Sequence, residues 1–283
     1  MSELIEAHEA HLRAAGYSPH TIDQRTRWLR RLHDHLPYGI AYADPAELEA
    51  FIGQDGWGQW TRCTATMHIR AAYRWWVQAG YLETDPAVHV ARPRHPKSLP
   101  DPVTDQELAH ALAASGEPWY TAILLAAANG LRAGEIAGLH REHITEVNTR
   151  IVRGKGGDPR SVDTHPLVWG HLKDRPPGPV ISGPGLGRPP TGAGLSRRAR
   201  THFDSIGLPQ VHLHRFRHWH ATALLDMATE LHGCEVSLRL VQESMGHASV
   251  ASTQGYTAVR SGQRRRAIAA LPIPTGTQKS TEQ

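Results

Sequence analysis

The alternation of hydrophobic and polar positions in the first third of the chain has the spacing of helices. One segment, residues 20–36, begins after Ser18, a typical N-cap residue, and a proline suited to the first helical turn. A second, residues 61–82, keeps the helical period until Gly80, a residue type common at helix C-termini. We therefore predict that residues 1–90 form a compact helical domain.

The helical pattern stops at residues 91–103. This segment holds four prolines among several basic residues, a composition that disfavours helix and core burial and predicts a linker. Thr104 and Glu107 then match a capping box, so a second domain is predicted over residues 104–263. Residues 264–283 start with three arginines and continue as polar chain, which predicts a disordered tail unless it docks on a neighbouring subunit.

The second domain mixes helical and strand-like patterns. An apolar helix is predicted to stop at Gly130, and residues 150–167 contain two short strand-like runs around a glycine-rich turn, which indicates a β-hairpin. Residues 183–195 (GPGLGRPPTGAGL) are interpreted as a loop, and helical patterns resume over about residues 214–256. The predicted fold is mainly α with a small β-hairpin, in two domains: one helical and one mixed α+β.

Composition narrows the possible partners and compartment. The 283 residues include 31 lysines and arginines against 27 aspartates and glutamates, a balance that suits a polyanionic partner. The two cysteines, Cys63 and Cys234, are far apart, which indicates neither a disulfide framework nor a thiolate metal site and fits a reducing cytoplasm. No apolar run approaches the roughly 20 residues of a membrane span, and the start lacks a signal-peptide core.

Basic side chains occur at two sites suited to phosphate. Arg132 follows a helix end and opens the next helix, where its planar fork and the backbone N–H groups could bind the same anion. Lys155 lies at the tip of the glycine-rich turn. Each has a plainer interpretation, since Glu135 could pair with Arg132 and a turn lysine is usually solvated.

A histidine-rich segment, residues 212–220, follows later in the chain. His214, Arg217 and His218 lie at helical spacing and share a face. The segment could also offer imidazoles to a metal ion, but it has no acidic or cysteine ligand, and Arg215 and Arg217 would repel a cation. We therefore expect no metal here.

The stretch MGHASVASTQGY supplies the last two candidates. Gly246 permits a tight turn that would present His247, and Tyr256 follows on a polar segment with little core to fill. A tyrosine in a polar loop does not by itself indicate a function. The order of all the candidates along the chain does indicate one.

Four motifs in this order resemble the catalytic domain of the tyrosine recombinase (phage integrase) family. They are GLRxGE around Arg132, the GKG hairpin at Lys155, HxxRHxxAT from His214 to Thr222, and GHxxxxxxxxY from Gly246 to Tyr256. The amino-terminal region also resembles the family's helical core-binding domain. Departures occur at Asp158, Trp219 and His220, which concern packing and backbone contacts and leave the six functional positions filled.

The resemblance implies metal-free and cofactor-free DNA strand transfer. Tyr256 would attack the scissile phosphate and form a 3′-phosphotyrosyl link, with His214 as the base. Arg132 and Arg217 would bind the nonbridging oxygens. The remaining implied roles are a phosphate hydrogen bond from His247, protonation of the leaving 5′ oxygen by Lys155, and support from Glu135 and His218.

The implied partners are double-stranded DNA with a specific crossover site and three further copies of the chain, a homotetramer on DNA. Accessory directionality factors or host DNA-bending proteins could join them. We expect an enzyme of the bacterial cytoplasm, associated with the nucleoid and not with a membrane. Integration and excision of a phage or mobile element is favoured over a Xer-like dimer resolvase.

Two alternatives come from other functional classes. A type IB-like topoisomerase would relax supercoils without giving recombinant products. A non-catalytic DNA-binding protein would be indifferent to Tyr256→Phe.

Overall fold

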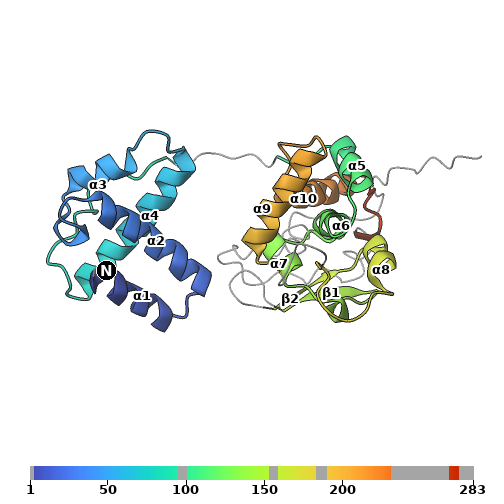
Figure 1. Ribbon diagram of the computed structural model, residues 1–283, viewed down its shortest axis with the longest axis horizontal. Helices are drawn as coiled ribbons and strands as arrows, with labels where there is room; N and C mark the ends of the chain where they lie inside the picture. The colour runs from blue at the N-terminus through green and yellow to red at the C-terminus, as the bar shows by residue number, and fades with distance from the viewer. Residues whose placement is uncertain (1–2, 95–100, 153–158, 183–189, 231–267, 274–283) are drawn as a thin grey trace, which may run out of the picture. The chain divides into compact units, whose positions relative to one another are not determined.

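The computed structural model describes residues 3–94, 101–152, 159–182, 190–230 and 268–273 (Figure 1). They are mostly helical, with one two-stranded antiparallel sheet, so the predicted fold class is confirmed. The chain divides into two compact units, Met1–Leu99 and Pro100–Gln283. The boundaries at residues 90 and 104 stay predictions, since residues 95–100 lie outside the described ranges.

The first unit is a set of packed helices. Ser18 caps the second helix by accepting a hydrogen bond from the backbone N–H of Thr21 at 3.2 Å, as its sequence predicts. Gly80 follows the last helix with a left-handed φ of +77°, which suits a glycine after a helix end. The elements are α1 (Glu3–Ala14), α2 (Pro19–His35), the 3₁₀ helix η1 (Ile40–Tyr42), α3 (Pro45–Ile52) and α4 (Gln59–Gln78).

The second unit carries the hairpin and the remaining helices. Its first helix begins with the predicted capping box of Thr104 and Glu107, and its second ends just before Gly130. The helices are α5 (Asp105–Ala114), α6 (Trp119–Ala128), α7 (Ala133–Ala137), the 3₁₀ helix η2 (Arg141–His143), α8 (Pro166–Leu172), α9 (Gly192–Ser205) and α10 (Leu213–Glu230).

The predicted hairpin is present as strands β1 (Asn148–Ile151) and β2 (Arg160–Asp163). They pair antiparallel, with Ile151 opposite Arg160 at the end nearest the turn. The tip of the turn, including Lys155, lies outside the described residues.

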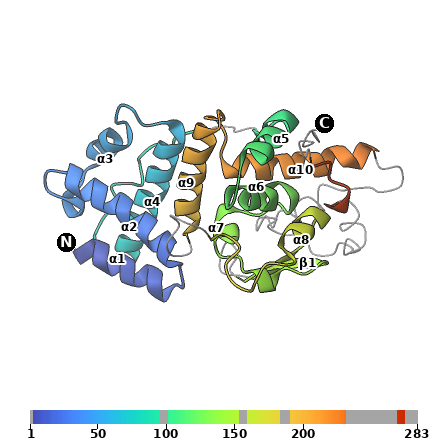
Figure 2. The ribbon, with the colours of Figure 1, turned by 45° about the vertical axis from the view of Figure 1, so that its right-hand side comes forward.

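Helix α6 forms the centre of the second unit's core. All its residues from Thr121 to Ala128 are buried. Nearly all of these residues are apolar, so the helix has no polar face to turn toward solvent. Helix α10 packs along α6, as the views in Figures 1 and 2 agree. This packing brings the end of α6 close to residues early in α10.

The prediction of a loop over residues 183–195 is wrong at its end, because α9 begins at Gly192. Thr191 caps the helix by accepting from the backbone N–H of Gly194 at 3.1 Å. The glycines conceal the helical spacing in the sequence. Gly192 is needed for close packing, since a Cβ there would lie 2.6 Å from the Cα of Gly134 in α7.

Residues 268–273 are the part of the tail that the structure describes. Ile268 and Leu271 are buried, and Ile273 packs against the core of the second unit. These apolar residues pack residues 268–273 against their own chain.

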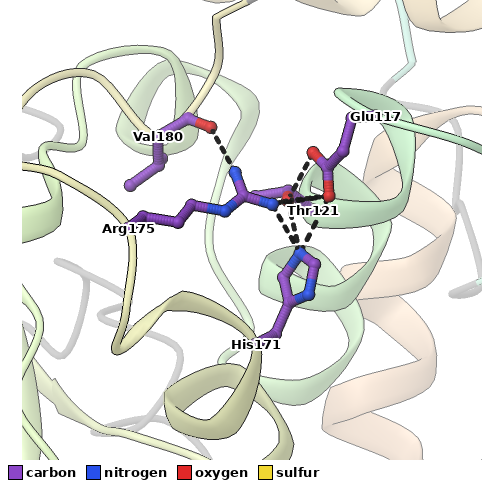
Figure 3. A network of polar contacts seen from close by, with 5 residues as sticks. All are labelled: Glu117, Thr121, His171, Arg175 and Val180. Carbon is purple, nitrogen blue, oxygen red and sulfur yellow. Dashed lines mark hydrogen bonds and ion pairs between the residues drawn. The ribbon is translucent and has the colours of Figure 1, made fainter.

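A polar network joins α6, α8 and the segment after α8 (Figure 3). Glu117 binds the hydroxyl of Thr121, the imidazole of His171 and the guanidinium of Arg175, the last at 2.6 Å. Arg175 also donates to the carbonyl oxygen of Val180 at 3.4 Å. These bonds lower the pKa of Glu117 to about 2, against the burial that would raise it.

Within the described ranges, no helix has the length and apolar character needed to cross a membrane.

Candidate active site

Arg132 stands immediately before α7, at a turn that only glycine allows. Gly130 has a φ of +64°, and a Cβ at this position would lie 2.6 Å from the imidazole of His220. The backbone N–H of Arg132 donates to Glu135 Oε2 at 2.8 Å, and its Nη1 donates to Glu135 Oε1 at 2.9 Å. The contact expected between Glu135 and Arg132 is therefore present.

Arg217 reaches the same turn from α10. Its side chain is almost fully buried, with 1% of the residue exposed, and its Nη1 donates a hydrogen bond to the carbonyl oxygen of Gly130. Burial, together with the charges of Arg132 and Arg160, lowers the pKa of Arg217 to about 9, while Glu135 acts in the opposite direction. The two predicted phosphate-binding arginines thus belong to one cluster.

His214 and His218 lie one turn apart on α10. Their rings make an edge-to-face contact with centroids 4.4 Å apart. Desolvation of the ring, then the charges of His218, Arg217, His212 and Arg132, lower the pKa of His214 to about 4. The pKa of His218 is also lowered, by burial and by Arg217. His214 is therefore neutral near pH 7, in the form that can accept a proton.

Two residues near the cluster had no predicted role there. Arg160 on β2 donates through Nε to Glu135 Oε1 at 3.0 Å and through Nη2 to Glu135 Oε2 at 2.9 Å. His220 is fully buried, and its Nδ1 lies 2.9 Å from the carbonyl oxygen of Ala127. Neither contact can be read from the sequence, because the register of the hairpin places Arg160 and the packing of α10 on α6 places His220.

Three of the six predicted catalytic residues lie in one cluster: Arg132 precedes α7, and His214 and Arg217 lie on α10. Lys155, His247 and Tyr256 lie outside the described residues. Three arginines around the single carboxylate of Glu135 leave a net positive charge, which suits an anion such as a phosphate. Among the residues that the structure describes, no group of three histidines, cysteines or acidic residues could hold a metal ion.

The chain is similar to known proteins in sequence and in fold, among them one relative and two solved structures. The tyrosine recombinase XerC of Mesorhizobium japonicum is 30% identical over 244 residues, which span 78% of this chain and 76% of the relative. The integrase from mycobacterium phage Brujita is 28% identical, with a TM-score of 0.52, and the match covers 98% of this chain and 95% of that one. No protein-family model matches the chain.

A lambda integrase tetramer bound to a Holliday junction shares the fold at 15% identity, with a TM-score of 0.67, over 90% of this chain and 79% of that one. The likeness in sequence to the Mesorhizobium relative, over most of both chains, is the stronger evidence. The chain belongs to the tyrosine recombinase family, the site-specific recombinases that transfer DNA strands.

Proposed function

We propose that this chain cuts and rejoins duplex DNA at a specific crossover site through a 3′-phosphotyrosyl intermediate on Tyr256. The observation that carries the proposal is the cluster of Arg132, Arg217 and a neutral His214, assembled from α10 and the turn before α7. Cleavage of a phosphodiester without a metal ion requires a nucleophile, a base and neutralisation of the phosphate charge. The cluster supplies the base and the positive charge, and Tyr256 is the nucleophile.

Arg132 and Arg217 bind the two nonbridging oxygens of the scissile phosphate. Their guanidinium groups are fixed by Glu135 and by the carbonyl oxygen of Gly130, so little reorganisation accompanies the build-up of charge in the transition state. Burial and the like charges of Arg132 and Arg160 lower the pKa of Arg217, and a bound phosphate would offset those like charges.

His214 accepts the phenolic proton as Tyr256 attacks. Phenols have a pKa near 10, so attack at neutral pH needs a base and a positive site. The imidazole of His214 is neutral before DNA binds, and the negative charge of the phosphate raises its basicity as the complex forms. His218 stacks edge-on against this ring and supports its orientation.

Lys155 protonates the leaving 5′ oxygen, and His247 donates a further hydrogen bond to the phosphate. Tyr256 keeps the energy of the broken bond in the phosphotyrosyl link, so no nucleotide cofactor is required for rejoining. These three roles rest on the positions of the residues in the family's motifs.

The helical unit binds DNA through the outer face of α4. A groove of about 610 Å³ runs along this face, and its lining includes Trp60, Thr64, Met67, Arg74 and Arg92. Trp60 and Met67 are 50% and 58% exposed, so they place apolar surface on the lining of this groove. A basic groove with exposed apolar side chains suits the phosphates and base edges of duplex DNA.

The same surface gives a simple binding test. Arg74→Ala should weaken DNA binding similarly for all sequences and reduce the slope of log K against log salt by about 1. An unchanged salt slope would contradict a phosphate contact from Arg74 in this groove.

The active assembly is a homotetramer on DNA, in the cytoplasm of a bacterial host and on its nucleoid. Strand exchange between two duplexes needs four cleavages, and a lambda integrase with this fold forms a tetramer on a Holliday junction. Accessory directionality or host DNA-bending proteins are compatible partners.

The biological role that we favour is integration and excision of a phage or mobile element. The match to the Brujita phage integrase extends over nearly all of both chains. A Xer-like resolvase role is the second candidate, because the Mesorhizobium relative is a XerC recombinase.

Product analysis tests the proposed function. Plasmids carrying DNA from beside the chain's own gene, paired with a candidate chromosomal site, should yield reciprocal recombinant junctions. Recombination between two directly repeated copies of a single site, without a second partner site, would favour the resolvase role. Supercoil relaxation without any recombinant junction would contradict recombination and support the topoisomerase alternative.

A further inference from the structure

Arg160 makes the most complete ion pair in the described part of the active-site cluster. Its guanidinium meets the carboxylate of Glu135 side-on, with two nearly equal bonds of 3.0 and 2.9 Å. The side chains of Arg160 and Glu135 are 17% and 3% exposed, so water screens this pair weakly. The pair joins β2 to α7, the short helix that follows Arg132.

The charges of Arg132, Glu135 and Arg160 show what Arg160 adds to the Arg132–Glu135 pair. Glu135 orients Arg132 through its Nη1 and its backbone N–H, but an isolated pair of the two would have no net charge. Addition of Arg160 makes the trio net positive. Since Arg160 takes up both carboxylate oxygens, the attraction of Glu135 for Arg132 is divided between two cations.

Proton uptake by Glu135 does not offer another route to the same charge. Burial alone would raise the pKa of this carboxyl, but the hydrogen bond from Arg160 and the backbone N–H of Arg132 lower it below its usual range. Glu135 therefore remains ionised at neutral pH, and a cation has to balance it.

We propose that Arg160 is a positioning residue that neutralises Glu135, so that Arg132 keeps its orientation and presents its positive charge to a phosphate. The inference rests on the proposed DNA cleavage and adds to it a residue that acts on Arg132 through Glu135. A role of this kind predicts that loss of Arg160 is repaired by removing the charge of Glu135.

A double-mutant experiment tests this repair. Arg160→Gln should lower the single-turnover rate of covalent DNA adduct formation about 10²-fold, because the uncompensated Glu135 cancels the charge of Arg132. Arg160→Gln combined with Glu135→Gln should recover most of that rate, since the amide holds no charge. A double variant as slow as Arg160→Gln, or slower, would overturn the proposal.

Arg150→Gln is the matched control, because Arg150 is an exposed arginine on β1 of the same hairpin. It removes the same charge from the protein and should leave the adduct rate within about threefold of wild type. Arg160→Lys guards against a folding defect, since it keeps the charge but loses the fork. Its rate should fall between those of wild type and Arg160→Gln, at an unchanged circular dichroism spectrum.

Inorganic sulfate gives a second measurement that needs no DNA cleavage. Sulfate raises the melting temperature of proteins in general, and an anion bound at the site adds a further rise. Arg150→Gln keeps the site and should show the full rise of wild type. Wild type and the double variant should show the same extra rise from a bound anion, and Arg160→Gln should lose it. If wild type forms no DNA adduct but this pattern holds, the proposed function fails and the role of Arg160 stands. An equal rise in Arg160→Gln and wild type would overturn the role of Arg160.

Discussion

The carbonyl oxygen of Gly130 accepts a hydrogen bond from the buried guanidinium of Arg217. This bond ties the end of α6 to α10, two residues before Arg132. Because Gly130 has a φ of +64° and lies against His220, the position of the catalytic arginines depends on a turn that side chains do not tolerate.

Gly130→Ala should therefore destabilise the protein and disorganise the site. We expect a loss of about 1–3 kcal/mol in the free energy of unfolding, from the left-handed φ and from contact with His220. Denaturant titration measures the loss. Gly170→Ala is the control, since Gly170 lies inside α8 with open space around its Cα, and it should be neutral or stabilising. Equal stabilities for the two variants would contradict the role of the turn.

Arg132→Lys should affect catalysis more than DNA binding. A lysine keeps the charge but cannot pair with Glu135 and a phosphate oxygen through one planar group, so cleavage should slow on the order of 10²-fold. Single-turnover cleavage at saturating DNA measures this rate. Arg150→Lys on the exposed side of β1 should cleave at the wild-type rate. A parallel loss in both variants would remove Arg132 from the site.

Lys155→Ala should be rescued by a better leaving group. The variant should bind DNA normally and cleave slowly, because the departing 5′ oxygen lacks its acid. A 5′-thio linkage, whose thiolate needs no proton, should restore cleavage to near the wild-type rate. Arg132→Lys should gain no comparable rescue. Absence of rescue in Lys155→Ala would assign the acid role elsewhere.

The helical unit should lose stability in mild acid. Burial, then the charges of His11 and Arg25, lower the pKa of His8 from 6.5 to about 4, and burial and Arg25 do the same for His68. Below pH 6.5 the unfolded chain binds protons that the folded unit excludes, so stability should fall between pH 6.5 and 4.

Denaturant titrations across this pH range, followed by tryptophan fluorescence, measure the effect. Five of the eight tryptophans lie in the helical unit, and two of them, Trp75 and Trp76, contact His8, so much of the signal reports on this unit. His8→Gln should flatten the pH dependence, whereas His20→Gln on the exposed start of α2 should leave it unchanged. Identical pH profiles for wild type and His8→Gln would contradict a neutral buried His8.

Local signals predicted much of the fold. The capping box of Thr104 and Glu107, the stop at Gly130 and the hairpin depend on neighbouring residues, and all three are present. Helix α9 was missed because its start is rich in glycine. Its glycine at position 192 is required by the backbone of α7, a contact that no local pattern reveals.

The candidate site divides in the same way. Motifs led to Arg132, Glu135, His214 and Arg217, and the structure places them in contact or close together. The pairing of Arg160 with Glu135 joins residues 25 positions apart and depends on hairpin register. Burial of Ile268 and Leu271 in the tail likewise depends on tertiary packing.

Covalent trapping tests the central claim most directly. Wild type and Tyr256→Phe are mixed with DNA from beside the chain's own gene, denatured in SDS, and the DNA-linked peptide is mapped by mass spectrometry. The account predicts an adduct on Tyr256 at the 3′ phosphate of the crossover site, absent in Tyr256→Phe. An adduct on another residue, or one that persists in Tyr256→Phe, would contradict it.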